Sequence, residues 1–294
     1  MDAVITYVND MEPIWRMSFV KNIGFSDISN DVRFRCLGTL RFVLRGISEH
    51  MKFIDRVFLV VSNIEQVPDY VNDNVVIITH DMFIPKEYLP TFNALTIECF
   101  LWNIPGLSEE FIYFNDDMIP INKMEKEDFF IDGLPCLKFR EKKVTSDMFN
   151  SIIQIDNYYA SKLAKNKKTY DFLWTNHIMT PFLKTEYINS FKVYEKEITS
   201  HISPIRKDTQ FSQHYFSNCL FYLDKYINHS INHIYVGTNI TVNTLKDIVM
   251  GIKNEKVICL NDYGLLKDCT LFETIYNINE TLSIILPHKC IYEK

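Results

Sequence analysis

The sequence predicts an α/β protein with a mostly parallel sheet and a largely helical C-terminal portion. Three observations carry this prediction. The first 120 residues alternate apolar runs with segments of helical periodicity, the rhythm of strand–helix–strand units. The apolar runs are continuous, which is typical of strands buried on both faces. After about residue 120 the rhythm stops and helical spacing becomes more frequent.

The individual elements follow from these patterns. Apolar runs predict early strands at residues 3–8, 56–62, 75–79 and 111–114, and residues 231–242 have a strand-like composition; a further apolar run lies at 257–260. Helical spacing predicts helices at residues 32–48, 91–102, 145–163, 187–191 and 209–222. We expect residues 1–122 to form the α/β core and residues 123–294 to form a mostly helical portion that completes the active site.

Composition excludes several classes of protein. The chain has 294 residues and a net charge of −6, without the basic stripe of a nucleic-acid binder. Its eight glycines make up a far smaller share of the residues than the usual ~7%. None forms the glycine motif of a dinucleotide site or a phosphate loop. No Cys-x-x-Cys pair occurs among seven cysteines, which disfavours zinc knuckles and redox motifs.

The location expected from the sequence is the cytoplasm. Unpaired cysteines suit a reducing compartment, and neither a signal peptide nor a run of ~20 apolar residues is present. Contact with a membrane would then be peripheral, at its inner face.

The strongest candidate site is Asn115-Asp116-Asp117, directly after the apolar run at 111–114. Ligands of open α/β sheets bind beyond the carboxyl ends of strands. Two adjacent carboxylates there suit a hard cation, Mg²⁺ or Mn²⁺, that also holds a diphosphate. The alternative is a turn with a helix N-cap, for which Asn and Asp are also favoured.

Three further places put polar groups beside apolar runs. Tyr7 and Asn9 follow the first run, where a nucleotide pocket or a plain loop is expected. His177 could act as a general base, hold a phosphate or be structural. Arg206 suits phosphate oxygens, and Asp262 follows the run at 257–260; a surface ion pair is the alternative for each.

One long block carries a family resemblance. Leu89-Pro90-Thr91-Phe92-Asn93 and Ile97-Glu98 precede Ile104-Pro105-Gly106-Leu107-Ser108-Glu109, Phe111-Ile112-Tyr113 and Asn115-Asp116-Asp117. This block resembles the signature of the Stealth family of sugar-phosphate transferases. That family includes bacterial capsular polysaccharide phosphotransferases and the catalytic core of the N-acetylglucosamine-1-phosphotransferase that tags lysosomal enzymes.

The resemblance extends over nearly the whole chain. The family's four blocks are resembled, in order and spacing, by residues 2–15, by 33–117, by 177–184 with 203–216, and by 259–262. Three positions depart from the family pattern. Cys36 stands where the family usually has Asp, Tyr7 replaces a common Trp, and Asp10 replaces a glycine.

The resemblance implies a nucleotide-sugar-binding sheet of the GT-A or Rossmann-like kind and a definite reaction. A hexose-1-phosphate unit passes from a UDP-sugar to a hydroxyl of a glycan or lipid-linked glycan, and UMP leaves. The metal would bind Asp116 and Asp117. The expected catalytic residues are Asp117, His177, Arg206 and Asp262. The expected substrate-binding residues are Thr6, Tyr7, Asn9, Arg45, Asn93, Asn115 and Lys184.

Two other functions stay open from the sequence. A metal-dependent glycosyltransferase would use the same donor but release UDP. A non-catalytic nucleotide-sugar binder is suggested by Cys36 and the altered first block.

Overall fold

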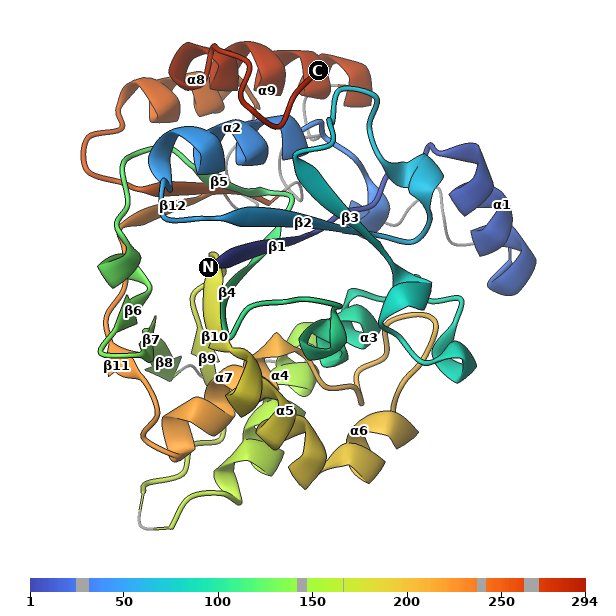
Figure 1. Cartoon of the computed structure of the whole chain (residues 1–294), viewed down its shortest axis with the longest axis vertical. Coiled ribbons are helices and arrows are strands. Elements are labelled where there is room, and N and C mark those ends of the chain that lie inside the picture. Colours follow the sequence, from blue (N-terminus) through green and yellow to red (C-terminus); the bar gives the residue numbers. More distant parts are fainter. Residues whose placement is uncertain (25–31, 142–146, 166, 237–241, 262–269) are drawn as a thin grey trace.

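The computed structural model describes residues 1–24, 32–141, 147–165, 167–236, 242–261 and 270–294. A five-stranded sheet with the order β10-β4-β1-β2-β3 lies at its centre (Figure 1). Its strands are β1 (Asp2–Thr6), β2 (Arg56–Val61), β3 (Val75–Thr79), β4 (Glu110–Asn115) and β10 (Thr180–Leu183). β1 to β4 run parallel and β10 is antiparallel to β4. The predicted α/β class with a mostly parallel sheet is confirmed.

The strand order contains a reversal at β1. The chain passes from β1 to β2 and β3 on one side, and β4 then pairs with the other side of β1. Crevices beyond the carboxyl ends of strands at such a switch point are the usual ligand sites of open α/β sheets. The carboxyl ends of β1 and β4 are therefore the place to look for a site.

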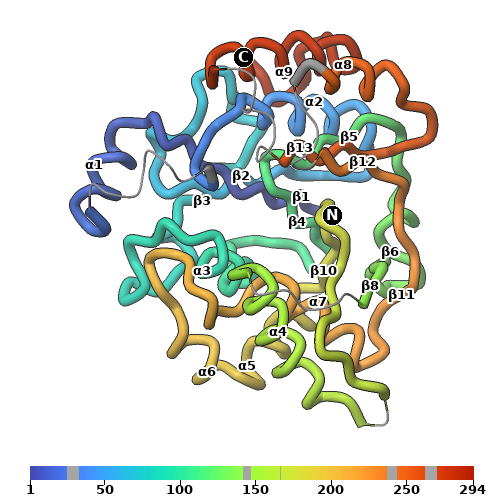
Figure 2. Tube along the Cα trace, turned by 180° about the vertical axis from the view of Figure 1, so that it is seen from behind, coloured from blue at the N-terminus to red at the C-terminus, as the bar shows by residue number. Residues whose placement is uncertain are grey.

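Continuous apolar runs form these strands because each face of the sheet has its own core. Ala3 and Ile5 of β1 face one hydrophobic cluster, and Val4 between them faces another. Side chains alternate across a strand, so a strand covered on both faces must be apolar throughout. Helices lie above and below the sheet in Figure 1, and the view from behind in Figure 2 shows the same layers.

The helices divide between the two faces. α2, α8 and α9 cover one face, whereas α3, α4, α5, α6 and α7 lie on the other (Figures 1 and 2). The helices on the first face, together with α1 beside the sheet, are α1 (Pro13–Asn22), α2 (Leu40–His50), α8 (Val242–Met250) and α9 (Leu271–Ile285). Those on the second face are α3 (Ala94–Cys99), α4 (Met148–Ser161), α5 (Lys184–Val193), α6 (Glu195–Ser200) and α7 (Gln213–Tyr222).

Eight shorter strands build three small sheets. The one that matters for the site contains β12 (His233–Val236), β13 (Val257–Leu260) and β5 (Met118–Pro120). The others contain β6 (Phe130–Ile131), β7 (Leu134–Leu137) and β11 (Ile227–Asn228), and β8 (Phe139–Glu141) with β9 (Leu173–Thr175). Short 3-10 turns lie at Val32–Phe34, Ile64–Gln66, His80–Met82, Lys86–Tyr88, Leu101–Asn103 and Lys126–Asp128.

The predicted helix at 32–48 begins later than expected. Val32–Phe34 is a 3-10 turn, and Gly38 with φ of 75° separates it from α2. The main sheet contains strands from both halves of the chain, because β10 from the second half pairs with β4. The division of roles at residue 122 stays a prediction. Within the described ranges, no helix has both the length and the apolar character needed to cross a membrane.

Gly46 lets α2 lie directly on β5. A Cβ atom at this position would lie 2.3 Å from the carbonyl oxygen of Pro120. No side chain fits there, so only glycine permits this close approach. The contact fixes the strand that begins immediately after Asp117.

Candidate active site

Polar side chains gather where β1 and β4 end. Thr6 and Asn115 are register partners at the last position of the two strands. The chain then turns through Asp116 and Asp117 into β5. β13 pairs with β5, and the N–H of Leu260 donates to the carbonyl of Asp117 at 2.9 Å. The second and fourth sequence blocks therefore meet at this edge.

Asp117 lies beside a histidine and a cysteine that are distant in sequence. Its Oδ2 is 3.6 Å from Nε2 of His177 and 3.4 Å from Sγ of Cys259. The other carboxylate oxygen, Oδ1, is buried without a hydrogen-bond partner among the described residues. The prediction that the blocks containing Asp117 and His177 meet in space is confirmed.

The electrostatics of His177 reflect two opposing effects. Burial lowers its pKa, but the carboxylates of Asp117 and Glu98 raise it more, so the net pKa is above the ordinary value. The contact with Asp117 is longer than a direct hydrogen bond, and such distances in ligand-free sites commonly shorten when substrate binds. His177 can therefore take up a proton that the neighbouring carboxylate stabilises.

A buried glutamate lies behind this pair. Glu98 accepts hydrogen bonds from the N–H of Gln213 at 2.8 Å and from the hydroxyl of Tyr113 at 3.3 Å. Burial raises the pKa of Glu98, and the Gln213 N–H and the charge of Arg206 oppose that rise. Tyr113 also contacts Thr6 Oγ1 at 3.1 Å, which connects Glu98 to the end of β1.

Arg206 belongs to the same electrostatic neighbourhood. Its charge lowers the pKa of both Glu98 and His177. The guanidinium carries its charge at any physiological pH and matches phosphate oxygens in shape. The structure thus brings together the third sequence block and the Asn-Asp-Asp turn.

The charge of Asp116 affects the pKa values of a second group of residues. Its charge contributes to the raised pKa of Tyr7 and Cys36, for which burial is the larger cause. Tyr7 and Cys36 contact each other, with the phenolic oxygen 3.3 Å from Sγ. Cys36, which replaces the family's usual Asp, therefore lies within this site. Because its thiol stays protonated, the site has lost one negative charge relative to the family pattern.

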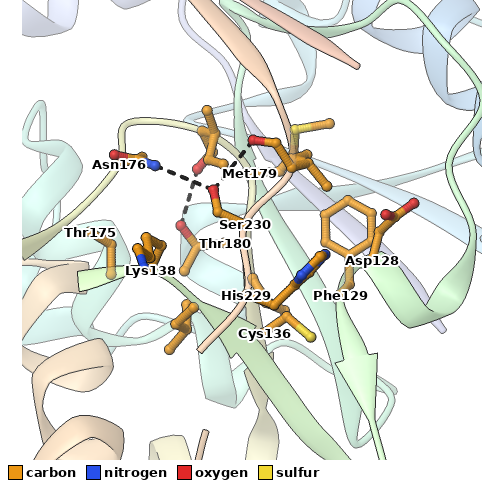
Figure 3. Close-up of a pocket in the computed structure, with 14 residues that line it drawn as sticks. Asp128, Phe129, Cys136, Lys138, Thr175, Asn176, Met179, Thr180, His229 and Ser230 are labelled. Atoms are coloured by element: carbon orange, nitrogen blue, oxygen red, sulfur yellow. Dashed lines mark hydrogen bonds between the residues drawn. The ribbon is translucent and has the colours of Figure 1, made fainter. Parts of the chain in front are cut away.

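The segment that carries His177 is held by hydrogen bonds around a small pocket (Figure 3). Asn176 Nδ2 donates to Ser230 Oγ at 3.4 Å, and Thr180 Oγ1 donates to the carbonyl of Ile178 at 3.1 Å. The ring of Tyr235 lies perpendicular to that of His177, with centroids 6.1 Å apart. These contacts restrict where the imidazole can point.

Arg45 and Asn93, two residues predicted to bind substrate, contact other parts of the protein in the structure. Arg45 donates to both carboxylate oxygens of Glu293 and to the carbonyl of Leu286, so its guanidinium ties α2 to the C-terminal segment. Asn93 is buried; it caps α3 and donates to the carbonyl of Ser203. Contact of either residue with the substrate stays a prediction.

Lys184 lies at the opposite edge of the sheet. It follows Leu183, which pairs with Glu110 at the amino end of β4. Five residues separate Glu110 from Asn115, which corresponds to roughly 17 Å along a strand. This position lies away from the turn at Asp116 and Asp117, and substrate binding by Lys184 stays a prediction.

Asn9 and Asp262 were also predicted to belong to the site. Asn9 lies in the loop after β1, where its Oδ1 accepts the N–H of Met11 and closes a local turn. Asp262 lies outside the described residues, and its role stays a prediction. Its neighbour Asn261 donates its N–H to the carbonyl of Val236, which fixes the chain next to Asp117.

The comparisons with known proteins agree with this arrangement. A family model described as Stealth protein CR2, conserved region 2, matches residues 33–136. The chain carries this Stealth region. The matched region contains Glu98, Asn115, Asp116 and Asp117, so it includes the acidic part of the site. The resemblance to the Stealth family is confirmed.

Several curated proteins are similar to the chain. A capsular polysaccharide phosphotransferase of Actinobacillus suis is 30% identical over 67% of this chain and 57% of its own length. The receptor polysaccharide phosphotransferase WefC of Streptococcus oralis is 38% identical over 46% and 43%. The capsular polysaccharide phosphotransferase WcwK of Streptococcus pneumoniae is 25% identical over 89% of each. The chain spans about half the length of the first two relatives.

Among solved structures, the galactosyltransferase LgtC in complex with donor and acceptor sugar analogs is similar to the Stealth-containing chain. The similarity covers 97% of this chain and 96% of that one, with 10% identity and a TM-score of 0.47.

The structure also identifies two site residues that sequence reasoning did not select. Glu98 lies in the quoted motif, and only its burial beside Tyr113 separates it from an ordinary helical glutamate. Cys259 occupies the fourth block, but its proximity to Asp117 depends on the pairing of β13 with β5.

Proposed function

We propose that this protein transfers a hexose-1-phosphate unit from a UDP-sugar to a hydroxyl of a surface polysaccharide or glycan. The acceptor oxygen forms a bond to the sugar-side phosphorus, and the bond from that phosphorus to the bridging oxygen breaks. UMP leaves with the electron pair of that bond, and the sugar–oxygen bond stays intact. The Stealth region and the phosphotransferase names of the relatives support this reaction.

One observation carries the proposal. Asp117 and His177, from different sequence blocks, meet at the carboxyl ends of β1 and β4, with 3.6 Å between Oδ2 and Nε2. A carboxylate and an imidazole together can support transfer of a proton from an acceptor hydroxyl. The position at the switch point of the sheet suits a nucleotide ligand.

The residues at the turn fit a divalent cation such as Mg²⁺ or Mn²⁺. The buried Oδ1 of Asp117 lacks a protein partner among the described residues, and hard cations prefer carboxylate oxygens. Asp117 and the adjacent Asp116 would hold the ion. When bound, it would offset negative charge on the diphosphate and polarise the phosphoryl oxygens.

His177 and Arg206 act on opposite parts of the reaction. His177 accepts the hydroxyl proton of the acceptor, and the charge of Asp117 stabilises the resulting imidazolium. Arg206 holds the oxygens of the transferred phosphate, as the charge and shape of a guanidinium favour. Glu98 offsets the positive charges of both residues from its buried position. Asp262 completes the acidic set in this proposal.

The remaining assignments follow from the same placement. Residues 1–122 bind the donor and the cation, whereas residues 123–294 supply the acceptor side. Thr6, Tyr7, Asn9 and Asn115 lie at or directly after the ends of β1 and β4, where the nucleotide would bind. The acceptor is a glycan or a lipid-linked glycan reached by peripheral contact at the cytoplasmic face of the membrane.

Nucleotide analysis tests the reaction. The protein is incubated with Mg²⁺, a panel of UDP-sugars and acceptor glycans, and the released nucleotide is separated and identified. We expect UMP that depends on the acceptor. Release of UDP would instead indicate a glycosyltransferase, and binding of a UDP-sugar without turnover would indicate a non-catalytic binder.

A further inference from the structure

Three metal-competent atoms from three separate segments converge in the site. A carboxylate oxygen of Asp117, a ring nitrogen of His177 and Sγ of Cys259 all lie within 4.8 Å of one another. Asp117 follows β4, His177 precedes β10, and Cys259 lies in β13. The pairing of β13 with β5 and the hydrogen bonds around Asn176 hold these segments in place.

The separations match those of a tetrahedral zinc site. Zinc–ligand distances of about 2.1 Å to oxygen and nitrogen and about 2.3 Å to sulfur, at tetrahedral angles, place neighbouring ligands roughly 3.4–3.6 Å apart. The carboxylate–imidazole separation of 3.6 Å and the carboxylate–thiol separation of 3.4 Å are already within this scale. Only the imidazole and the thiol have to move closer, by about an ångström at most, if they start at the 4.8 Å limit.

The donor types favour a thiophilic ion. Mg²⁺ prefers oxygen ligands and water, so it would use the carboxylates and leave the imidazole and thiol unbound. Zn²⁺ and related ions accept carboxylate oxygen, imidazole nitrogen and thiolate sulfur together, with a fourth position open to water or substrate. The same site therefore offers different donor sets to hard and to thiophilic cations.

We propose that Asp117, His177 and Cys259 form a binding site for a thiophilic divalent cation, Zn²⁺ or a close relative, that inhibits the protein. Binding releases the thiol proton of Cys259 and occupies Nε2 of His177. The inhibitory consequence rests on the proposed function, because it assumes that His177 accepts the acceptor proton. The binding itself does not depend on that function.

Spectroscopy with Co²⁺ tests the binding without any assay of activity. Co²⁺ replaces Zn²⁺ in such sites, and its thiolate charge-transfer absorption reports a bond to sulfur. We expect this absorption on adding Co²⁺ to the metal-free protein, and its loss on adding Zn²⁺. In Cys259→Ser the absorption disappears, and Zn²⁺ affinity falls at least ~100-fold, since even groups that only support a ligand contribute ~10–100-fold.

Two further variants separate the site from a general effect of cysteine loss. Cys136→Ser is the matched control, because Cys136 lies in β7 and its thiol donates to the carbonyl of Glu127. It should keep the absorption. His177→Gln should keep the sulfur signal but weaken Zn²⁺ binding and alter the visible absorption that reports tetrahedral coordination. Circular dichroism and melting temperature establish that each variant is folded.

The possible results divide clearly. No thiolate absorption in the folded wild-type protein, or the same absorption in folded Cys259→Ser, would overturn the proposed site. Absorption together with Zn²⁺ inhibition of UMP release that weakens in Cys259→Ser supports both the site and its effect. Absorption together with UMP release that Zn²⁺ does not inhibit would support the binding site and overturn the inhibition. Absorption without any UMP release under all metal conditions would support the binding site and count against the proposed function.

Discussion

Asp117→Asn removes one negative charge from the site and keeps the shape of the side chain. The carboxylate lies 3.6 Å from Nε2 of His177. At that distance an ion pair contributes about 5 kcal/mol at an effective dielectric constant of ~20 and about 1 kcal/mol at ~80. The two side chains are 27% and 22% exposed, so the interaction lies between these limits. Loss of this interaction should lower the pKa of His177 in the variant.

The direction of this change in the pKa of His177 follows from two opposing effects. The carboxylate raises its pKa and burial lowers it, so without the carboxylate the pKa should drop to or below the ordinary value. An NMR titration of the metal-free protein measures this change, and nucleotide analysis measures turnover, which should be abolished. Asp73→Asn, at an exposed loop position, is the matched control. Full turnover with unchanged Mg²⁺ dependence, or an unchanged pKa of His177, would refute the reasoning.

Three other predictions concern the metal, the base and the packing of α2. EDTA should stop UMP release and Mg²⁺ or Mn²⁺ should restore it; undiminished release in excess chelator would contradict the metal assignment. His177→Ala should lower turnover by roughly 10²–10⁴ while donor affinity and melting temperature stay close to wild type. A parallel loss of donor affinity would assign His177 to the phosphate. Gly46→Ala should cost about 1–3 kcal/mol in unfolding free energy, because its Cβ would overlap Pro120, whereas Glu49→Ala at an exposed position of the same helix should cost little.

The parts of the fold that the sequence predicted well are strands made of continuous apolar runs. Residues 75–79 form β3 with the predicted bounds, and the apolar run at 257–260 forms β13. Their apolar runs are long enough to be specific. Every residue of β13 is buried, whereas Val76 of the edge strand β3 is exposed. The strands β6, β8 and β11 have two or three residues each, too few for any periodicity to appear in the sequence.

The sequence could locate the site but could not identify all of the residues that form it. Asp117 and His177 were selected because each follows or precedes an apolar run in a block resembling the Stealth family, and the fold joins those blocks. The contact of Arg45 with Glu293 could not be predicted, because the two residues are 248 positions apart and no local pattern indicates which way a helical arginine points. Cys259 was missed as a neighbour of Asp117 for the same reason, because strand pairing decides it.

Glu98 shows a different limit. A glutamate within a helical segment is most often exposed, and only three-dimensional packing reveals that this one is buried beside Tyr113 and the N-terminus of α7. Its burial carries a cost that the hydrogen bonds from Gln213 and Tyr113 partly offset. A sequence pattern does not contain this information, because the three residues come from separate elements.

The fate of the sugar-side phosphorus tests the central claim most directly. A UDP-sugar labelled at that phosphorus is incubated with the protein, Mg²⁺ and acceptor, and the label is followed into the glycan and nucleotide fractions. Transfer of a hexose-1-phosphate unit predicts that the label enters the glycan as a phosphodiester and that unlabelled UMP is released. Label that remains in UDP while the sugar enters the glycan would contradict the account.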